Sequence, residues 1–270
     1  MVRAYTTDAD MLIAHALPRR LPESAAVVSE SAPAYLIDVL GNETGPDTLL
    51  KEQDRKTIAL YEGSPPMVSK GFEHRSIKNK INHRNTAYAE AANLIKAASA
   101  GVRVPVVYAL QQRTRIGIPT SSTVFMEYVA GTSLRDVFMN KAIDLKYLLG
   151  LMPVIKQLHA GGVHHIDFGP HALLESTEGE LVCIDFQYAA FFSQPVPENT
   201  AHMLGYFGWA VCTNRGWCSR ELMDTWYEET AGVLGFADNQ QCKNIYLAAL
   251  RKRHSTEERL AGFANKLTRL

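Results

Sequence analysis

The sequence predicts a mixed α+β fold in two lobes, and three observations support that prediction. Short strand-like runs dominate the first half and surround one alanine-rich helical segment, 85–100. In the second half the apolar residues recur at helical spacing. Two aspartates, Asp167 and Asp185, each follow an apolar residue and lie eighteen positions apart. We expect a small β-rich lobe over 1–130 and a reduced helical lobe over 131–270.

The first lobe is predicted to contain about five strands and one helix. Its candidate strands are rich in Val, Ile, Tyr and Phe and lie at 34–40, 56–62, 65–72, 104–110 and 121–129. The helix at 85–100 should end at Gly101, because glycine commonly follows the last helical turn. Strand composition gives way to helical periodicity over 129–132, which sets the expected boundary.

The second lobe is predicted to be mainly helical. Residues 133–140 form a short candidate helix, and 145–160 form a longer one, although Pro153 within it disfavours a regular helix. Three further helices are expected at 201–212, 219–233 and 240–254. Between the two aspartates we expect a short hairpin.

The composition is ordinary for a globular protein in water. Hydrophobic residues make up 46% of the chain and charged residues 21%, and no run reaches the roughly 18 apolar residues that a membrane-spanning helix needs. The first twenty residues lack the pattern of a signal peptide. The four cysteines form no CxxC pair, so we expect reduced thiols and a cytoplasmic protein.

The net charge of zero conceals a segregation of charge. Between 160 and 200 there are six acidic residues and no Lys or Arg, whereas seven Lys or Arg lie in 67–103 and seven from Lys243 onward. This pattern suits a metal site beside a cleft that receives anions, although any single cation is more simply a solvated surface residue. Basic and aromatic residues do not interleave as in a nucleic-acid-binding module, so no nucleic-acid partner is expected.

The two aspartates match what phosphoryl transfer requires. One carboxylate must orient the attacking hydroxyl and accept its proton, while another holds Mg²⁺ on the nucleotide phosphates. Asp167 lies in HHIDFGPHALL, and Asp185 ends the apolar run LVCI. Alone, Asp167 would be interpreted as the cap of a turn, but its position relative to Asp185 favours the catalytic interpretation.

The segment LHAGGVHHIDFGPHALL, followed by LVCIDFQ, resembles the lipopolysaccharide core heptose and Kdo kinases, a family of the protein-kinase-like superfamily. The resemblance is best over 70–188. It implies a bilobal protein-kinase-like fold, ATP and Mg²⁺ as cofactors, and transfer of phosphate to a hydroxyl of a sugar or glycolipid acceptor. It also implies a cytoplasmic enzyme peripheral to the inner membrane, with its basic segments contacting anionic lipid.

The resemblance implies roles for further residues of the first lobe. Lys70 in MVSKGF is similar to the strand lysine that contacts the α and β phosphates, and Glu90 to its helical partner. Lys56 is the rival lysine, and each of these charges would otherwise be a surface residue. Glu127 and Val129, where the strand TVFMEYV closes, match the hinge that binds adenine.

His171 is the second candidate metal residue. It lies four residues after Asp167, beside the position of the kinases' metal-binding asparagine, which is Ala172 here. His171 either ligates the metal or orients the loop backbone, and the sequence leaves both open because Mg²⁺ prefers oxygen ligands.

The chain departs from the protein-kinase pattern in several places. Ile166 replaces the arginine that meets a phosphorylated activation loop, Gln187 replaces the glycine of D-F-G, and 41–45 lacks a GxGxxG pattern. The segment after Gln187 is too short for peptide docking, and 201–212 lacks the aspartate that braces the catalytic loop. A sugar kinase is favoured, with an atypical protein kinase and a catalytically weak pseudokinase that acts as a binding module as alternatives.

Aromatic residues gather in the last third of the chain. Six of them lie close together in sequence: Tyr206, Phe207, Trp209, Trp217, Trp226 and Tyr227. Aromatic rings stack on sugars, but packing between helices is the stronger expectation here.

Overall fold

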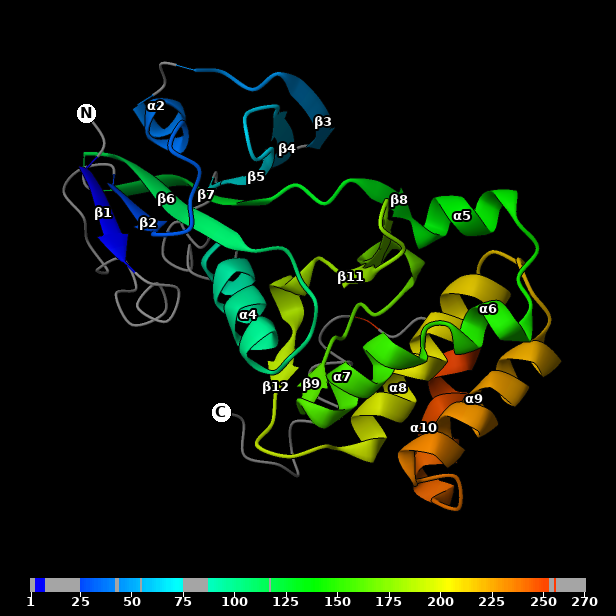
Figure 1. Cartoon of the computed structure of the whole chain (residues 1–270). Coiled ribbons are helices and arrows are strands. Elements are labelled where there is room, and N and C mark those ends of the chain that lie inside the picture. The colour runs from blue at the N-terminus through cyan, green and yellow to red at the C-terminus, as the bar shows by residue number, and fades with distance from the viewer. Residues whose placement is uncertain are drawn as a thin grey trace. The chain divides into compact units, whose positions relative to one another are not determined.

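The computed structural model describes residues 3–7 (backbone only), 25–41, 44–53, 55–74, 87–116, 118–252 and 255. The chain divides into two units, the first comprising Met1–Lys96 with Pro105–Tyr128 and the second Ala97–Val104 with Val129–Leu270. The first contains the main sheet and the second most of the helices (Figure 1). The predicted mixed α+β fold, with a sheet part and a helical part, is confirmed.

A seven-stranded sheet forms the first unit, in the order β1-β2-β6-β7-β5-β4-β3. Its strands are β1 Arg3–Thr7, β2 Ala25–Ser29, β3 Thr48–Gln53, β4 Lys56–Tyr61, β5 Met67–Glu73, β6 Val107–Arg115 and β7 Ile118–Glu127. β1 and β2 pair in parallel, and the other neighbours pair antiparallel. The four strands predicted from Lys56 onward are confirmed as β4 to β7, whereas β1, β2 and β3 were not predicted.

The prediction of a strand over 34–40 is wrong, because this segment forms helix α2, Leu36–Gly41. Its buried residues are Leu36, Val39 and Leu40, which have the i, i+3, i+4 spacing of one helical face. They pack into a hydrophobic core together with residues from the central strands. The Leu, Ile and Val content suggested a strand, but the spacing of the buried residues is helical.

Helix α4, Ala87–Ser99, confirms the predicted alanine-rich helix as far as the described residues reach. Gly101 follows it with φ of 81°, a left-handed conformation that ends the helix at the expected position. In Figure 1, α2 and α4 lie on opposite faces of the sheet. Successive strand residues point to opposite faces, so Met67 of β5 joins the core beneath α2 while Lys70 faces α4.

The described residues of the second unit form six helices with short strands and turns between them. The helices are α5 Leu134–Asn140, α6 Leu145–Leu149, α7 Met152–Ala160, α8 Pro197–Gly208, α9 Arg220–Leu234 and α10 Gln240–Arg251. The strands are β8 Gly131–Ser133, β9 Val163–His164, β10 Leu173–Ser176, β11 Leu181–Cys183 and β12 Ala190–Phe191. The 3₁₀ turns are η2 Pro170–Ala172 and η3 Phe186–Tyr188, and Trp209–Thr213 forms a π-helical turn, η4.

The prediction of a single helix over 145–160 is wrong, because Gly150 and Leu151 separate α6 from α7. Pro153 lies in the first turn of α7, where a missing N–H breaks no helical hydrogen bond. The short helix predicted at 133–140 is confirmed as α5, and the three later ones as α8, α9 and α10. No helix among the described residues is long and apolar enough to cross a membrane.

The core of the second unit surrounds α8, which is buried from Asn199 through Gly208. Trp226 of α9 lies against Phe207, with ring centroids 5.2 Å apart. A methyl group added at Gly205 would lie 2.5 Å from the Tyr246 carbonyl oxygen, so glycine is what allows α10 to approach α8 so closely.

Candidate active site

In the first unit, Lys70 of β5 and Glu90 of α4 form a buried ion pair. Lys70 Nζ lies 2.5 Å from Glu90 Oε2, and the two side chains are only 7% and 1% exposed. Burying either charge alone would cost several kcal/mol, so each side chain requires the other. Lys56, the rival lysine, and Lys70 both lie over the ring of Phe72, with Nζ 5.9 Å and 5.8 Å from its centroid.

The two predicted hinge residues fall in different units. Glu127 closes β7 in the first unit, and its Oε2 accepts a hydrogen bond from the Val106 backbone N–H at 3.0 Å. Its own N–H donates to the Val106 carbonyl oxygen at 2.8 Å, so Glu127 fixes the chain that leads into β6. Val129 belongs to the second unit and is half-buried. Their role in adenine binding stays a prediction.

Two sequence features lie partly outside the described residues. In the loop 41–45, where a phosphate-binding pattern was sought, residues 42 and 43 are not described. In the basic flanks, 75–86 and most of the chain after Lys252 are likewise not described.

In the second unit, the segment after β9 carries Asp167. His165 and Ile166 are buried while Asp167 is half-buried, so the chain anchors the loop with the two preceding side chains. β9 itself is held by antiparallel pairing with β12, where His164 is opposite Ala190.

Asp185 lies two residues after the end of β11, in an unusual backbone conformation. Its φ is 64° and its ψ is 53°, in the left-handed region that non-glycine residues rarely adopt. Such conformations occur preferentially at functional sites, where the surrounding structure offsets their cost. The sequence pattern Asp185-Phe186-Gln187 gave no indication of this conformation, because the glycine expected nearby is absent.

The backbone of Ile184 joins the two aspartate-bearing segments. Its carbonyl oxygen accepts a hydrogen bond from His165 Nε2–H at 2.9 Å, and its N–H donates to the Ala172 carbonyl oxygen at 2.9 Å. The loop that carries Asp167 is therefore bonded on both sides to the residue that precedes Asp185. The predicted hairpin between the aspartates is confirmed as β10 and β11, which pair antiparallel.

His165 is a second link between these segments, one that was not predicted from the sequence. Its ring packs edge-on against Phe186 with centroids 4.6 Å apart. Burial lowers the pKa of His165, while the charges of Asp185 and Asp167 oppose that effect. The imidazole is therefore neutral near pH 7, with its proton on Nε2 where Ile184 accepts it.

Helix α8 contacts the chain that leads into the Asp167 loop, and it does so without the aspartate that the kinase pattern leads one to expect. The His165 backbone N–H donates to Met203 Sδ at 3.2 Å, and His164 Nε2 lies 3.2 Å from His202 Nδ1. The side chains of His164, His202 and Met203 are all buried. No spacing rule predicts this contact, because it depends on how α8 packs against β9.

His171 lies in the turn η2 with an exposed side chain. The pKa of His171 is lowered, mainly because neighbouring atoms desolvate the imidazole. The charges of Asp185 and Asp167 oppose this effect, and Arg135 adds to it. The imidazole thus responds to both candidate carboxylates. The structure brings Asp167, Asp185 and His171 into one neighbourhood of the second unit.

Mg²⁺ is the metal that the sequence resemblance implies, and the side chains are compatible with it. The described residues contain no group of three or more His, Cys, Asp and Glu arranged to hold a metal ion. Mg²⁺ is usually held by one or two carboxylates together with phosphate and water oxygens, so Asp185 would suffice as a protein ligand. The imidazole of His171 suits this hard cation less well.

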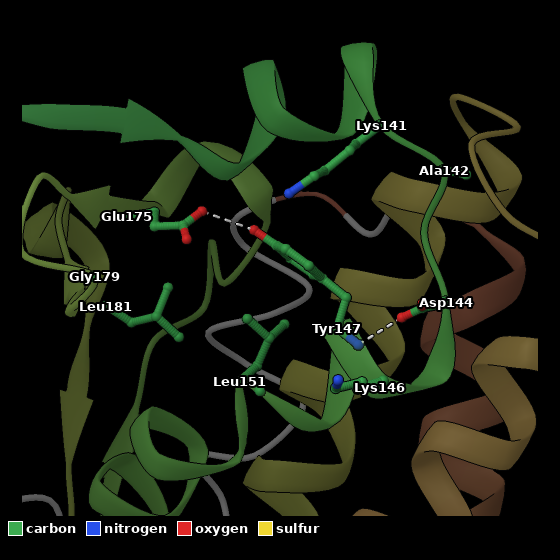
Figure 2. A pocket seen from close by; sticks show the side chains of 10 residues that line it. Lys141, Ala142, Asp144, Lys146, Tyr147, Leu151, Glu175, Gly179 and Leu181 are labelled. Carbon is green, nitrogen blue, oxygen red and sulfur yellow. Dashed lines mark hydrogen bonds between the residues drawn. The ribbon is translucent and has the colours of Figure 1, made fainter.

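A hollow of about 440 Å³ also lies in the second unit, and Figure 2 shows its lining. The Tyr147 hydroxyl donates to Glu175 Oε2 at 3.0 Å, and Lys141 Nζ lies 5.6 Å from the tyrosine ring centroid. Burial first, and then the bond to Glu175, raises the pKa of Tyr147 to about 12. None of the predicted site residues lines this hollow.

Comparisons with known proteins identify the fold. No protein-family model matches the chain, and no curated protein matches its sequence. Among solved structures, the chain is similar to one described as "WaaP in complex with acyl carrier protein", with 16% identity and a TM-score of 0.51. The match covers 82% of this chain and 99% of that one. At this identity the likeness shows the fold alone, and the expected kinase-like fold is confirmed.

Proposed function

We propose that this protein is an ATP-dependent kinase that transfers the γ-phosphate to a hydroxyl of a sugar in a lipopolysaccharide core or a similar glycolipid. One observation carries the proposal above the others: the backbone of Ile184 ties the Asp167 loop to the strand end that bears Asp185. Phosphoryl transfer is mainly a matter of positioning and electrostatic stabilisation, so two carboxylates on one hydrogen-bonded frame suit it.

In this proposal each aspartate has its own task. Asp167 accepts a hydrogen bond from the acceptor hydroxyl and takes its proton as the new bond to phosphorus forms. Asp185 holds Mg²⁺, which supplies positive charge to the phosphate oxygens. Both side chains are half-buried, which leaves carboxylate oxygens accessible to ligands while the loop beneath them stays packed.

Lys70 is proposed to contact the α and β phosphates, with Glu90 holding its ammonium in place. The short, buried contact between them supports this role, because a lysine fixed at one end presents its remaining protons in a defined direction. The cytoplasmic location and the contact with anionic membrane that the basic flanks suggest belong to the same proposal.

The first test is Mg²⁺-dependent ATP binding to the purified full chain, followed by isothermal calorimetry. The wild type should bind Mg·ATP, Asp185→Ala and Lys70→Ala should bind it weakly, and Asp167→Asn should bind it nearly as the wild type does. Asp238→Asn is the matched control, because Asp238 is an exposed residue between α9 and α10.

Transfer itself is tested with ATP labelled at the γ-phosphate and isolated lipopolysaccharide as acceptor. Label should enter the glycolipid with the wild type and not with Asp167→Asn. A well-folded wild type that binds no Mg·ATP would favour the pseudokinase alternative, and normal transfer by Asp167→Asn would exclude the role given to that residue.

A further inference from the structure

A smaller hollow of about 170 Å³ lies in the second unit beside the Asp167 loop. Two arginines, three aromatic rings and one imidazole line it: Arg135, Arg215, Tyr206, Trp209, Trp217 and His171. We call it the arginine–tryptophan hollow. Pro170 and His171 form one wall, and they follow Asp167 by three and four residues along the loop. The hollow therefore adjoins the loop that carries Asp167, the residue proposed to receive the proton of the acceptor.

Within the part of the chain that the structure describes, the two arginines of the hollow have no acidic partner. Among the described residues, no ion pair involves Arg135 or Arg215. Both side chains are exposed, and the guanidinium carbon of Arg215 lies 5.8 Å from the ring centroid of Trp217, which also lines the hollow. A guanidinium held in this way suits a carboxylate or a phosphate, whose paired oxygens match its planar donors.

The aromatic side of the hollow is built where α8 changes its geometry. The rings of Tyr206 and Trp209 are stacked, with centroids 5.6 Å apart and planes 26° from parallel. Trp209 begins the π-helical turn η4, and such turns are rare and frequently lie at functional sites. Tyr206 is buried, whereas Trp209 and Trp217 are half-buried and are the more accessible rings. Flat aromatic faces of this kind pack well on the apolar face of a sugar ring.

We propose that the arginine–tryptophan hollow binds the acceptor sugar and recognises an anionic substituent on it, a carboxylate or a phosphate. This inference rests on the proposed kinase function and specifies the acceptor for that same site. The volume lies below the roughly 300–1,000 Å³ of typical small-molecule pockets, so the hollow suits one sugar ring rather than an oligosaccharide. The arginines bind the anionic group, and the rings hold the sugar so that a hydroxyl faces Asp167.

The test is a tryptophan fluorescence titration of the full chain, since Trp209 and Trp217 both line the hollow. The probes are glucose 6-phosphate, glucuronate, neutral glucose and inorganic phosphate. Glucose 6-phosphate or glucuronate should bind at least tenfold more tightly than glucose and than inorganic phosphate. Equal affinity for glucose would exclude recognition of the anion, and equal affinity for inorganic phosphate would exclude recognition of the sugar.

The variant for this test is Arg135→Ala/Arg215→Ala, with Arg251→Ala as the matched control at the exposed end of α10. The double variant should lose at least tenfold in affinity for the charged sugars, and the control should keep it. An unchanged affinity of the double variant, with an unchanged Tm, overturns the inference.

Calorimetry with Mg·ATP separates this inference from the proposed function. The double variant should bind Mg·ATP as tightly as the wild type, because the arginines serve the acceptor. A loss of Mg·ATP affinity would assign them to the nucleotide and overturn the inference. Conversely, a wild type that binds charged sugars but no Mg·ATP would refute the kinase function while leaving the sugar site in place.

Discussion

The two charged centres of this protein treat their charges in opposite ways. In the sheet unit, Lys70 and Glu90 are almost wholly buried and closed upon each other. In the helical unit, Asp167 and Asp185 keep half-exposed carboxylates on a backbone held by hydrogen bonds. Loss of the first centre should lower the stability of the fold, whereas the second centre is the one proposed to bind ligands. Measurements of stability and of turnover should therefore separate the two.

The largest effect should be on turnover, for a substitution at the Asp167–Asp185 centre. Asp167→Asn removes the proposed base but keeps the shape of the side chain, so kcat should fall by roughly 10²- to 10⁴-fold. Its free energy of unfolding should stay within about 0.5 kcal/mol of the wild type, as is usual for residues away from the core. Steady-state kinetics and urea unfolding of the same preparation test both halves. A stability loss as large as that of a core variant would erase the contrast between the centres.

The second-largest effect should be on stability, for a substitution in the Lys70–Glu90 ion pair. Glu90→Ala leaves the Lys70 ammonium buried without its partner and should lower the free energy of unfolding by about 3–5 kcal/mol. Urea unfolding measures this, with Glu178→Ala as the control because Glu178 is exposed in the β10–β11 turn.

A double variant sharpens the same point. Lys70→Met combined with Glu90→Met removes both charges, so it should cost less stability than either single substitution. If the double variant loses as much unfolding free energy as the two single variants together, the two charges do not stabilise each other.

A smaller effect is expected at the link between loop and strand. His165→Phe keeps a ring against Phe186 but removes the N–H that serves the Ile184 carbonyl oxygen. Leaving that oxygen without its donor should cost about 1–3 kcal/mol in unfolding free energy. We also expect kcat to fall while the Kd for Mg·ATP changes little, and a Kd that rises as kcat falls would contradict a role in holding the loop.

The smallest effect should appear on acidification. Burial lowers the pKa values of His165 and His159 below their ordinary value of 6.5. Below about pH 6.5 the unfolded chain binds protons that the folded chain does not, so stability falls as the pH falls. Each group contributes at most about 1.4 kcal/mol per pH unit. Tm measured from pH 7.5 to 5.5 should decline, and His165→Phe should show a shallower decline than the wild type.

The parts of the fold that could be predicted from sequence are those with strong local patterns. β4 to β7 contain runs rich in strand-forming residues, and α4 is rich in alanine at helical spacing. β3 could not be predicted, because every residue from Thr48 to Gln53 is exposed and no apolar alternation marks it. α2 was misassigned because its six residues are too few for composition to reveal a helical period.

The same distinction applies to the candidate site. Lys70, Glu90, Asp167 and Asp185 follow from motifs, and the structure pairs the first two directly. The contact between His164 and His202 depends on segments 38 residues apart that share no motif. The left-handed conformation of Asp185 and the arginine–tryptophan hollow likewise arise only when the chain is folded.

The link through Ile184 has a consequence for how this protein tolerates mutation. Position 184 contributes only main-chain atoms to the two hydrogen bonds, so almost any side chain there would preserve them. Proline is the exception, because it has no N–H to donate to Ala172. Substitutions at position 184 should therefore leave the relative placement of the two aspartates unchanged. Relatives of this protein can carry different residues at this position and keep the same geometry.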